Sequence, residues 1–473
     1  MSKLKRIVVF FQKTFKSSIA FLLFTFLFLP STVSAHAFGQ NYTLSIPFSL
    51  YFYGAGTVVI LSFLVAGFFL KPDKAKVLNS QIPLPGFINR VVFSPTIKLM
   101  AKITSLGFFL LTILSGFFGS SDSLQNFNVV FFWIIFWLGF TYLSAIFGPI
   151  WSVLNPWKII IELIELLTGT IHPKVKYPLQ LGYLPALFFI FGFIWLELLS
   201  NGLAINPKNL SILITGYTFF TVFAVFIFGE MWFLKGEFFS VFFDLIAKVS
   251  PFDFQKNGAY VRFPFMKLTS LDSSDLSLLI FIIFILSSTA YDGVRASTNW
   301  NKIYLSQTQS GQTLMLILSP LVFLILYLLS ISLIKILVKT NLNVYQLSLR
   351  FAFSLLPIAL VYNIAHYFTL FLIQGQSVIS IISDPFSLGW NLFGTSGYKI
   401  NTGIIGAKQV WNTQVFLIVS GHVAAVIISH FLAFKIFEDH KKAIISQIPM
   451  LILMVFYTVF GLWILSQPLR IGG

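Results

Sequence analysis

The sequence contains no cysteine and few charged residues. Of its 473 residues, only 10% are Asp, Glu, Lys or Arg. The lack of cysteine excludes disulfide bonds, thiolate metal sites and cysteine nucleophiles. No stretch is long enough or polar enough for a large soluble domain. The sequence also lacks a P-loop, a G-x-S-x-G motif and an H-E-x-x-H motif, which are signatures of nucleotide binding, serine hydrolysis and zinc proteolysis.

Apolar runs dominate the chain, which is 57% hydrophobic and contains 58 phenylalanines. A helix needs about 20 apolar residues to cross a hydrocarbon core of about 30 Å. The sequence therefore predicts an all-α fold, a polytopic transmembrane helical bundle in a lipid bilayer, with about ten spans after an N-terminal signal peptide. We interpret the abundant phenylalanine as a consequence of AT-rich codons. The ten predicted spans are 48–70, 97–118, 128–148, 182–200, 209–228, 276–290, 312–338, 350–374, 412–436 and 448–466.

Residues 1–35 have the pattern of a signal peptide, in which basic residues precede an apolar stretch at 19–29. The small residues of "STVSA" follow and predict cleavage between Ala35 and His36. A single integral membrane helical domain, residues 36–473, would remain. An uncleaved signal anchor and cleavage after Ala37 are the alternatives.

Lysine and arginine are distributed unevenly between the predicted loops. With the mature N-terminus outside, 20 of them fall on the cytoplasmic side and six outside. This asymmetry follows the positive-inside rule. It explains the net charge of +16 without a nucleic-acid partner. It also predicts a multi-pass protein of the bacterial cytoplasmic (inner) membrane, with both mature termini extracytoplasmic.

Two loops are long enough to form structure of their own. In the cytoplasmic loop after the fifth span, residues at about 238–249 have apolar spacing typical of an interfacial helix. Just before it, "FGEMWFLKGE" predicts a helix break with Trp232 as an anchor and with Glu230 and Glu237 solvated. The outer loop 375–411 is rich in Gly, Ser, Asn and aromatic residues, and is expected to fold back as a lid or re-entrant segment.

Ionisable residues within membrane spans are candidates for function, because burying them is costly. At about 1.5 Å of rise per residue, His366 lies about 12 Å and His422 about 15 Å below the outer surface. They belong to consecutive antiparallel spans, so we expect them to face each other and share a ligand or a hydrogen-bond network. His430 lies about 12 Å deeper than His422 and is assigned a structural role in another layer.

Further polar residues could complete a site near this histidine pair. Glu197 and Asp292 lie near the outer ends of their spans, and Asn363 lies one turn from His366. If the signal is cleaved, the free amine and ring of His36 could chelate copper together. Imidazole is a common ligand of copper, zinc, iron and haem. The predicted metal site comprises His366, His422, His36, Asp292 and Glu197, with His430 and Asn363 as secondary residues.

Several stretches resemble a bacterial multi-pass membrane family labelled fenitrothion hydrolase. They are "AHAFGQNYTLSIPFSLYFYGAG", "GPIWSVLNPWK", "SDPFSLGWNLFG", "GHVAAVIISH" and "IPMLILMVFYTVFGLWILS", and the resemblance covers most of the chain. It implies hydrolysis of an organophosphate-type ester. The family pattern has an acidic residue just after the second histidine and often a further histidine near position 363. Here these positions are Phe431 and Asn363.

Three classes of function follow from these features. The leading one is a membrane protein with an outward-opening, His-lined site that binds copper, zinc or haem for transport or redox work. The second is a metal-assisted membrane hydrolase, in which a histidine-bound metal activates water. The third is a transporter or assembly subunit whose histidines only tie helices together. One haem between His366 and His422 remains an alternative, whereas the separation of His422 and His430 is expected to be too small for two stacked haems.

Overall fold

A computed structural model describes residues 34–37, 40–43, 47–70, 77–255, 258–271, 275–297, 300 and 302–467. The predicted signal peptide lies almost entirely outside these residues. The predicted cleavage point, between Ala35 and His36, falls within strand β1, Ser34–Ala37. This strand pairs in antiparallel fashion with β2, Gln40–Thr43, and places His36 opposite Asn41.

The predicted all-α membrane fold is confirmed. Within the described ranges, nine helical segments are long and apolar enough to cross a membrane. They are α2 (Phe48–Phe69), α5 (Pro95–Phe118), α6–η1–α7 (Phe127–Phe147), α11 (Pro207–Phe228), α13 (Leu276–Arg295), α14 (Gln309–Val338), α15–η8–α16 (Val344–Gln374), α18 (Ala407–Ile436) and α19 (His440–Ser466). The remaining predicted span is the shorter apolar helix α10, Leu184–Leu199.

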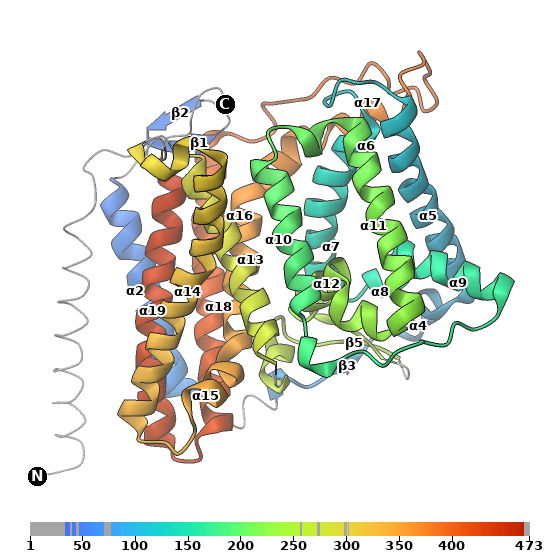
Figure 1. Cartoon of the computed structure of the whole chain (residues 1–473). Coiled ribbons are helices and arrows are strands. Elements are labelled where there is room, and N and C mark those ends of the chain that lie inside the picture. The colour runs from blue at the N-terminus through green and yellow to red at the C-terminus, as the bar shows by residue number, and fades with distance from the viewer. Residues whose placement is uncertain are drawn as a thin grey trace, which may run out of the picture.

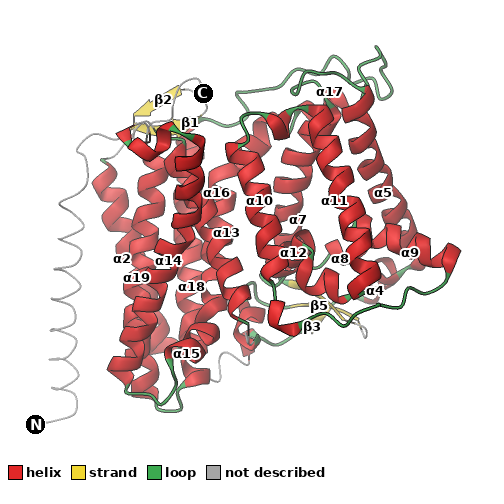
Figure 2. Cartoon of the chain, in the orientation of Figure 1, coloured by secondary structure: helices red, strands yellow, loops and turns green. Residues whose placement is uncertain are grey.

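Shorter elements connect these helices, and two of the long segments are divided (Figures 1 and 2). The divided segments are α6 (Phe127–Val130), η1 (Phe131–Gly139) and α7 (Phe140–Phe147), then α15 (Val344–Phe351), η8 (Ala352–Leu355) and α16 (Leu356–Gln374). The connecting elements are β3 (Ile82–Pro83), α4 (Gly86–Phe93), α8 (Trp151–Leu154), α9 (Pro156–Thr168), η2 (Leu179–Leu181), η3 (Leu203–Ile205), η4 (Trp232–Gly236), α12 (Phe238–Ala247), β4 (Phe252–Gln255), β5 (Gly258–Val261), η5 (Met266–Ser270), η7 (Tyr304–Gln307) and α17 (Ser377–Ile381).

The helices form two bundles that lie side by side (Figure 1). The first bundle contains α5, α6–η1–α7, α10, α11 and α12, and the second contains α2, α13, α14, α16, α18 and α19. The bundles meet where α10 packs against α13 and where η1 packs against α16. We call this contact the seam.

Helix α13 is the most buried of the long spans, with 83% of its apolar window buried. The predicted range, 276–290, is shorter than the observed helix because the last residues of the helix are polar. In the structure the helix continues to Arg295, and Asp292 lies in its last turn. Protein rather than lipid surrounds this helix, and such an environment can accommodate charged side chains that lipid would not.

Helix α12 is the segment predicted to lie at the membrane interface. An interfacial helix buries one face and exposes the other to water, but eight of its ten residues are buried. It packs against α7 and α10, so the bundle encloses it. The segment therefore forms a helix, but neighbouring helices cover the face that was expected to meet water, and the helix is buried.

The expectation that Glu237 is solvated is wrong. Glu237 is 0% exposed and caps the N-terminus of α12. Its Oε1 accepts hydrogen bonds from the Tyr217 hydroxyl at 2.5 Å and from the Phe239 amide at 3.0 Å. Its Oε2 accepts hydrogen bonds from the Ser240 amide and hydroxyl at 2.7 and 2.6 Å. Glu230 is exposed, as expected for a solvated residue.

Aromatic side chains gather where α12 meets the helices of the first bundle. Trp157 stacks on Phe239 with ring centroids 5.3 Å apart, and Trp151 contacts Phe243 at 4.9 Å. Trp137 and Phe242 also pack together, with centroids 4.7 Å apart. Codon composition accounts for the number of phenylalanines but does not account for this concentration in one bundle.

A small antiparallel sheet, in the order β3–β5–β4, closes one end of the first bundle (Figure 2). The Asp253 carboxylate on β4 forms ion pairs with Arg262 and with Lys267, the latter at 2.7 Å. Gln81 and Gln255 donate further hydrogen bonds to it. Burial alone would raise the pKa of Asp253, but the hydrogen bonds from Lys267 and Gln255 and the charges of Lys267 and Arg262 lower it below its usual value.

The predicted outer loop lies at the opposite end from this sheet (Figure 1). It begins with α17 and continues without helix or strand to residue 406. Side chains organise its backbone. Ser383 Oγ accepts hydrogen bonds from the amides of Phe393 and Thr395, and the Asp384 carboxylate accepts them from Leu388 and Gly389.

Candidate functional site

The centre of the candidate site is a carboxylate on α13 that receives two hydrogen bonds from α16. His366 Nε2 lies 2.9 Å from Asp292 Oδ2, and the Tyr367 hydroxyl donates to the same oxygen at 2.7 Å. The side chains of His366 and Asp292 are only 15% and 13% exposed. Arg295, one turn beyond Asp292, adds positive charge nearby. The structure thus brings together two of the five predicted site residues, Asp292 and His366.

A glycine next to the carboxylate permits this close approach of three helices. A Cβ atom at Gly293 would lie 2.4 Å from Ile464 on α19 and 3.6 Å from the His366 ring. The first distance is shorter than real Cβ contacts allow, and Ile464 is buried. The absence of a side chain at Gly293 therefore lets α19 pack against α13 beside the site.

Glu197, the third predicted residue, approaches this cluster from α10. It is close enough for the charge of Asp292 to act on it, and both charges act on Tyr367. Glu197 Oε2 is buried and has no hydrogen-bond partner among the described residues. Two neighbouring carboxyl groups in a buried environment repel each other when both are ionised.

Other polar atoms around the cluster are buried without a partner in the described part of the chain. They are the hydroxyls of Tyr142 and Tyr362 and the amide oxygen of Asn363. Asn363 and Tyr367 also line a cavity of about 10 Å³, together with Ser288 and Thr289 on α13. This volume is close to the smallest space that holds a water molecule. Buried polar atoms usually have partners, so this region is suited to bind a water molecule.

The cluster lies at the seam between the two bundles. Glu197 belongs to the first bundle and Asp292 to the second. The small cavity is likewise lined by Trp137 and Leu198 from the first bundle and by Asn363 from the second. A change of charge at this position therefore acts directly on the contact between the bundles.

His422 does not lie at the depth of His366, contrary to expectation. Gln414 on α18 donates to the Ala365 carbonyl at 3.0 Å, and Gly421 packs against Val361, where a Cβ would lie 2.1 Å from a methyl carbon. The two contacts place His422 about 9–14 Å from His366 along the helix axes, at 1.5 Å per residue. The reason is that α18 begins at Ala407, five residues before the predicted start of the span.

The His422 ring is fully enclosed within its own layer. It is 1% exposed, and its Nδ1 lies 2.7 Å from the Ile418 carbonyl of the preceding helical turn. Its Nε2 is buried and has no hydrogen-bond partner in the residues that the structure describes. A shared hydrogen-bond network between His366 and His422 is therefore not formed through these atoms.

His430 ties three helices together, as its assigned structural role requires. It is 0% exposed, with Nδ1 2.8 Å from Gln447 Oε1 on α19 and Nε2 2.8 Å from the Leu70 carbonyl. Leu70 is the C-cap residue of α2. The last carbonyls of a helix lack partners within the helix, and His430 supplies one.

The residues that the structure describes contain no group of three or more His, Asp or Glu side chains that could hold a metal ion. Asp292 and His366 provide two donors, and Tyr367 provides a third oxygen that is a weaker ligand while protonated. The side chain of His36 lies outside the described residues. The predicted five-residue metal site is therefore reduced to a pair of ligands in the described part of the chain.

Sequence reasoning missed three tyrosines of the cluster: Tyr362 and Tyr367, which are near Asp292, and Tyr142, which is near Tyr367. The available signal was the dipeptide of His366 and Tyr367, because adjacent residues on a helix point about 100° apart and can approach one carboxylate from two sides. Tyr142 offered no such signal, because it comes from a distant part of the sequence.

Comparisons with protein-family models, with curated proteins and with solved structures found no match for this chain.

Proposed function

We propose that this protein is a membrane transport protein whose Asp292–His366–Tyr367 cluster, together with Glu197, binds and releases a proton during its cycle. The observation that carries this proposal is the largely buried Asp292 carboxylate, which receives hydrogen bonds from two α16 side chains beside a second acidic residue from α10.

The cost of burying charge supports this proposal. Ionisable residues inside membrane helices are rare, and they commonly belong to ion pathways or proton relays. The His366–Asp292 pair crosses from α16 to α13, and neither residue is needed to cap a helix. A purely structural link could be made with neutral residues at lower cost.

Protonation has a direct structural consequence in this arrangement. While Asp292 is ionised, its Oδ2 accepts hydrogen bonds from both His366 and Tyr367. A proton added to the carboxylate removes its negative charge and weakens both hydrogen bonds, since charge-assisted hydrogen bonds are the stronger kind. The contact between α13 and α16, which lies within the second bundle beside the seam, then loosens. Transporters change access by moving one bundle against another around a central site.

The distribution of basic residues supports an orientation for this cycle. The end of the bundles that carries β3–β5–β4 and α4 also carries most of the described lysines and arginines, whereas the end with α17 carries few (Figure 1). By the positive-inside rule, the basic end faces the cytoplasm of a bacterial cell. The cluster would then be reached from the outer side.

Binding of a metal or haem is a second proposal, supported only by the His366–Asp292 pair. It requires ligands beyond those that the described residues bring together. Hydrolysis of an organophosphate-type ester, as the family resemblance implies, would depend on the same metal. Elemental analysis of the purified protein tests both ideas. A stoichiometric metal that His366→Ala removes would favour them over the proton site.

Charge movement after a pH jump tests the proton site without knowledge of the substrate. Proteoliposomes on a solid-supported electrode record a transient current when protons enter a site within the membrane. We expect this current for the wild type and its loss in Asp292→Asn. Asp122→Asn is the control, because Asp122 is exposed in the loop between α5 and α6. A wild-type response equal to that of empty liposomes would refute the proposal, as would an unchanged response in Asp292→Asn.

A further inference from the structure

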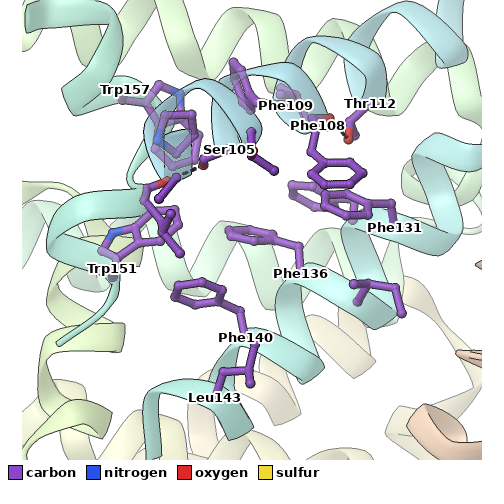
Figure 3. Close-up of a pocket in the computed structure, with 17 residues that line it drawn as sticks. Ser105, Phe108, Phe109, Thr112, Phe131, Phe136, Phe140, Leu143, Trp151 and Trp157 are labelled. Carbon is purple, nitrogen blue, oxygen red and sulfur yellow. Dashed lines mark hydrogen bonds between the residues drawn. The ribbon is translucent and has the colours of Figure 1, made fainter. Parts of the chain in front are cut away.

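The first bundle contains an apolar groove of about 420 Å³ between α5 and the α6–η1–α7 segment (Figure 3). Its walls are mostly aromatic. Phe108 and Phe109 project from α5, Phe136 and Phe140 from the opposite side, and Trp151 lies at one end. The groove does not include any residue of the candidate proton site.

Four of the five polar side chains in the groove walls, all but the exposed Thr104, have partners within the protein. Ser105 donates to the Leu154 carbonyl, and Thr112 donates to the Phe108 carbonyl. The indole nitrogens of Trp151 and Trp157 donate to Ser240 and Thr218. These groups are not left to recognise a polar ligand, so the groove suits a hydrocarbon chain.

The groove lies on the lipid-facing side of the first bundle. Only 6% of the apolar window of α5 is buried, and Leu143 on the groove wall is 43% exposed. Lipid chains surround such a surface. Because those chains are as apolar as the groove, the hydrophobic effect alone would not select one lipid over another. Selection requires an interaction with the headgroup.

Basic residues at one end of the groove provide that interaction. Lys98 precedes the groove residues Ala101 and Ser105 by three and seven positions, so all three lie on one face of α5. Lys102 and Lys158 adjoin the groove residues Ala101 and Trp157 and pair with Glu162 and Glu230. Lys98 lies over the Phe93 ring, 5.0 Å from its centroid.

We infer that this groove holds an acyl chain of an anionic glycerophospholipid, with the phosphate group near Lys98 at the basic end of α5. The apolar walls accept the chain, and the positive charge selects the headgroup. Each lysine near an anionic lipid surface strengthens binding by about fivefold. Bound lipid would occupy the space between α5 and α7 and support the aromatic packing around α12.

The second groove of the first bundle provides an internal comparison. It has a volume of about 550 Å³ between α10 and α11 and is also lined by aromatic residues. Lys158, next to Trp157, is the one lysine or arginine adjacent in sequence to its described lining residues, and it pairs with Glu230. Gly216 in its wall has open space where a side chain would lie. We therefore expect this groove to take lipid without preference for charge.

Lipid retention tests the inference. The protein is equilibrated in detergent with equal amounts of phosphatidylglycerol and phosphatidylcholine, purified by gel filtration, and its bound lipid is measured by mass spectrometry. The wild type should retain phosphatidylglycerol in preference. Lys98→Gln should reduce this preference about fivefold. Leu143→Trp should displace the retained phosphatidylglycerol by filling the groove, and Ala101→Trp serves the same purpose if Leu143→Trp does not fold.

Two matched variants separate this groove from general effects. Lys174→Gln removes a lysine in the loop after α9, away from the groove, and Gly216→Trp fills the second groove. Both should keep the wild-type preference for phosphatidylglycerol. Equal retention of the two lipids by the wild type would overturn the inference. Unchanged retention of phosphatidylglycerol after the groove is filled would also overturn it.

Discussion

Glu237→Ala should destabilise the protein strongly, although the sequence suggested a solvated side chain. The carboxylate accepts four hydrogen bonds inside the first bundle, from Tyr217, Phe239 and Ser240. Loss of an N-cap costs about 1 kcal/mol. A buried tyrosine hydroxyl left without an acceptor adds about 1–3 kcal/mol. The free energy of unfolding should therefore fall by about 3 kcal/mol.

Thermal unfolding in detergent, followed by tryptophan fluorescence and gel filtration, measures this effect. Glu230→Ala is the matched control, because the side chain of Glu230 is 81% exposed and should contribute less than about 1 kcal/mol. Glu237→Gln should fall between the two, since it keeps one acceptor oxygen but loses the charge. If Glu237→Ala unfolds at the same temperature as Glu230→Ala, the buried cap does not stabilise the bundle.

Three further predictions concern other parts of the molecule. Asp253→Asn should lower the free energy of unfolding. The difference from the wild type should be full above about pH 4, the ordinary pKa of aspartate. It should shrink as the pH falls through the lower pKa of Asp253 in the folded protein, as unfolding measured across this pH range would report. His430→Ala should lower the free energy of unfolding by about 2–4 kcal/mol, because it leaves buried partners on two helices unsatisfied. His422→Ala should lower it less, because only a carbonyl of its own helix loses a partner. Equal effects of the two variants would contradict this. Single cysteines introduced into this cysteine-free chain at Lys176 and Lys399 should react with impermeant thiol reagents from opposite sides of the membrane. Labelling of both from the same side would refute the proposed orientation, in which the basic end and the end with α17 lie on opposite sides.

The membrane fold could be predicted because it depends on local composition. Long apolar runs must form helices in a bilayer, where backbone groups have no water to bind. The predicted spans therefore correspond closely to the observed helices, including the shorter α10. The role of His430 was also accessible, since a fully buried imidazole requires partners on neighbouring helices.

The details of the site could not be predicted, because they depend on where helices begin and how they are offset. An earlier start of α18, at Ala407, was enough to move His422 out of the layer of His366. The local sequence predicts that Glu237 lies in an exposed break, but neighbouring helices enclose α12 and bury it. Tyr142 reaches the cluster from a distant segment, and no pattern along the sequence indicates such a contact.

Infrared spectroscopy of the carboxyl groups tests the central claim most directly. A protonated carboxylic acid has a C=O stretching band that a carboxylate lacks, so difference spectra of the protein in lipid across a pH titration report proton binding at buried acids. We predict a titrating band that is lost or shifted in both Asp292→Asn and Glu197→Gln, because the two groups interact. Asp122→Asn should leave it unchanged. A titrating band that persists unaltered in Asp292→Asn and Glu197→Gln would contradict the proposed proton site.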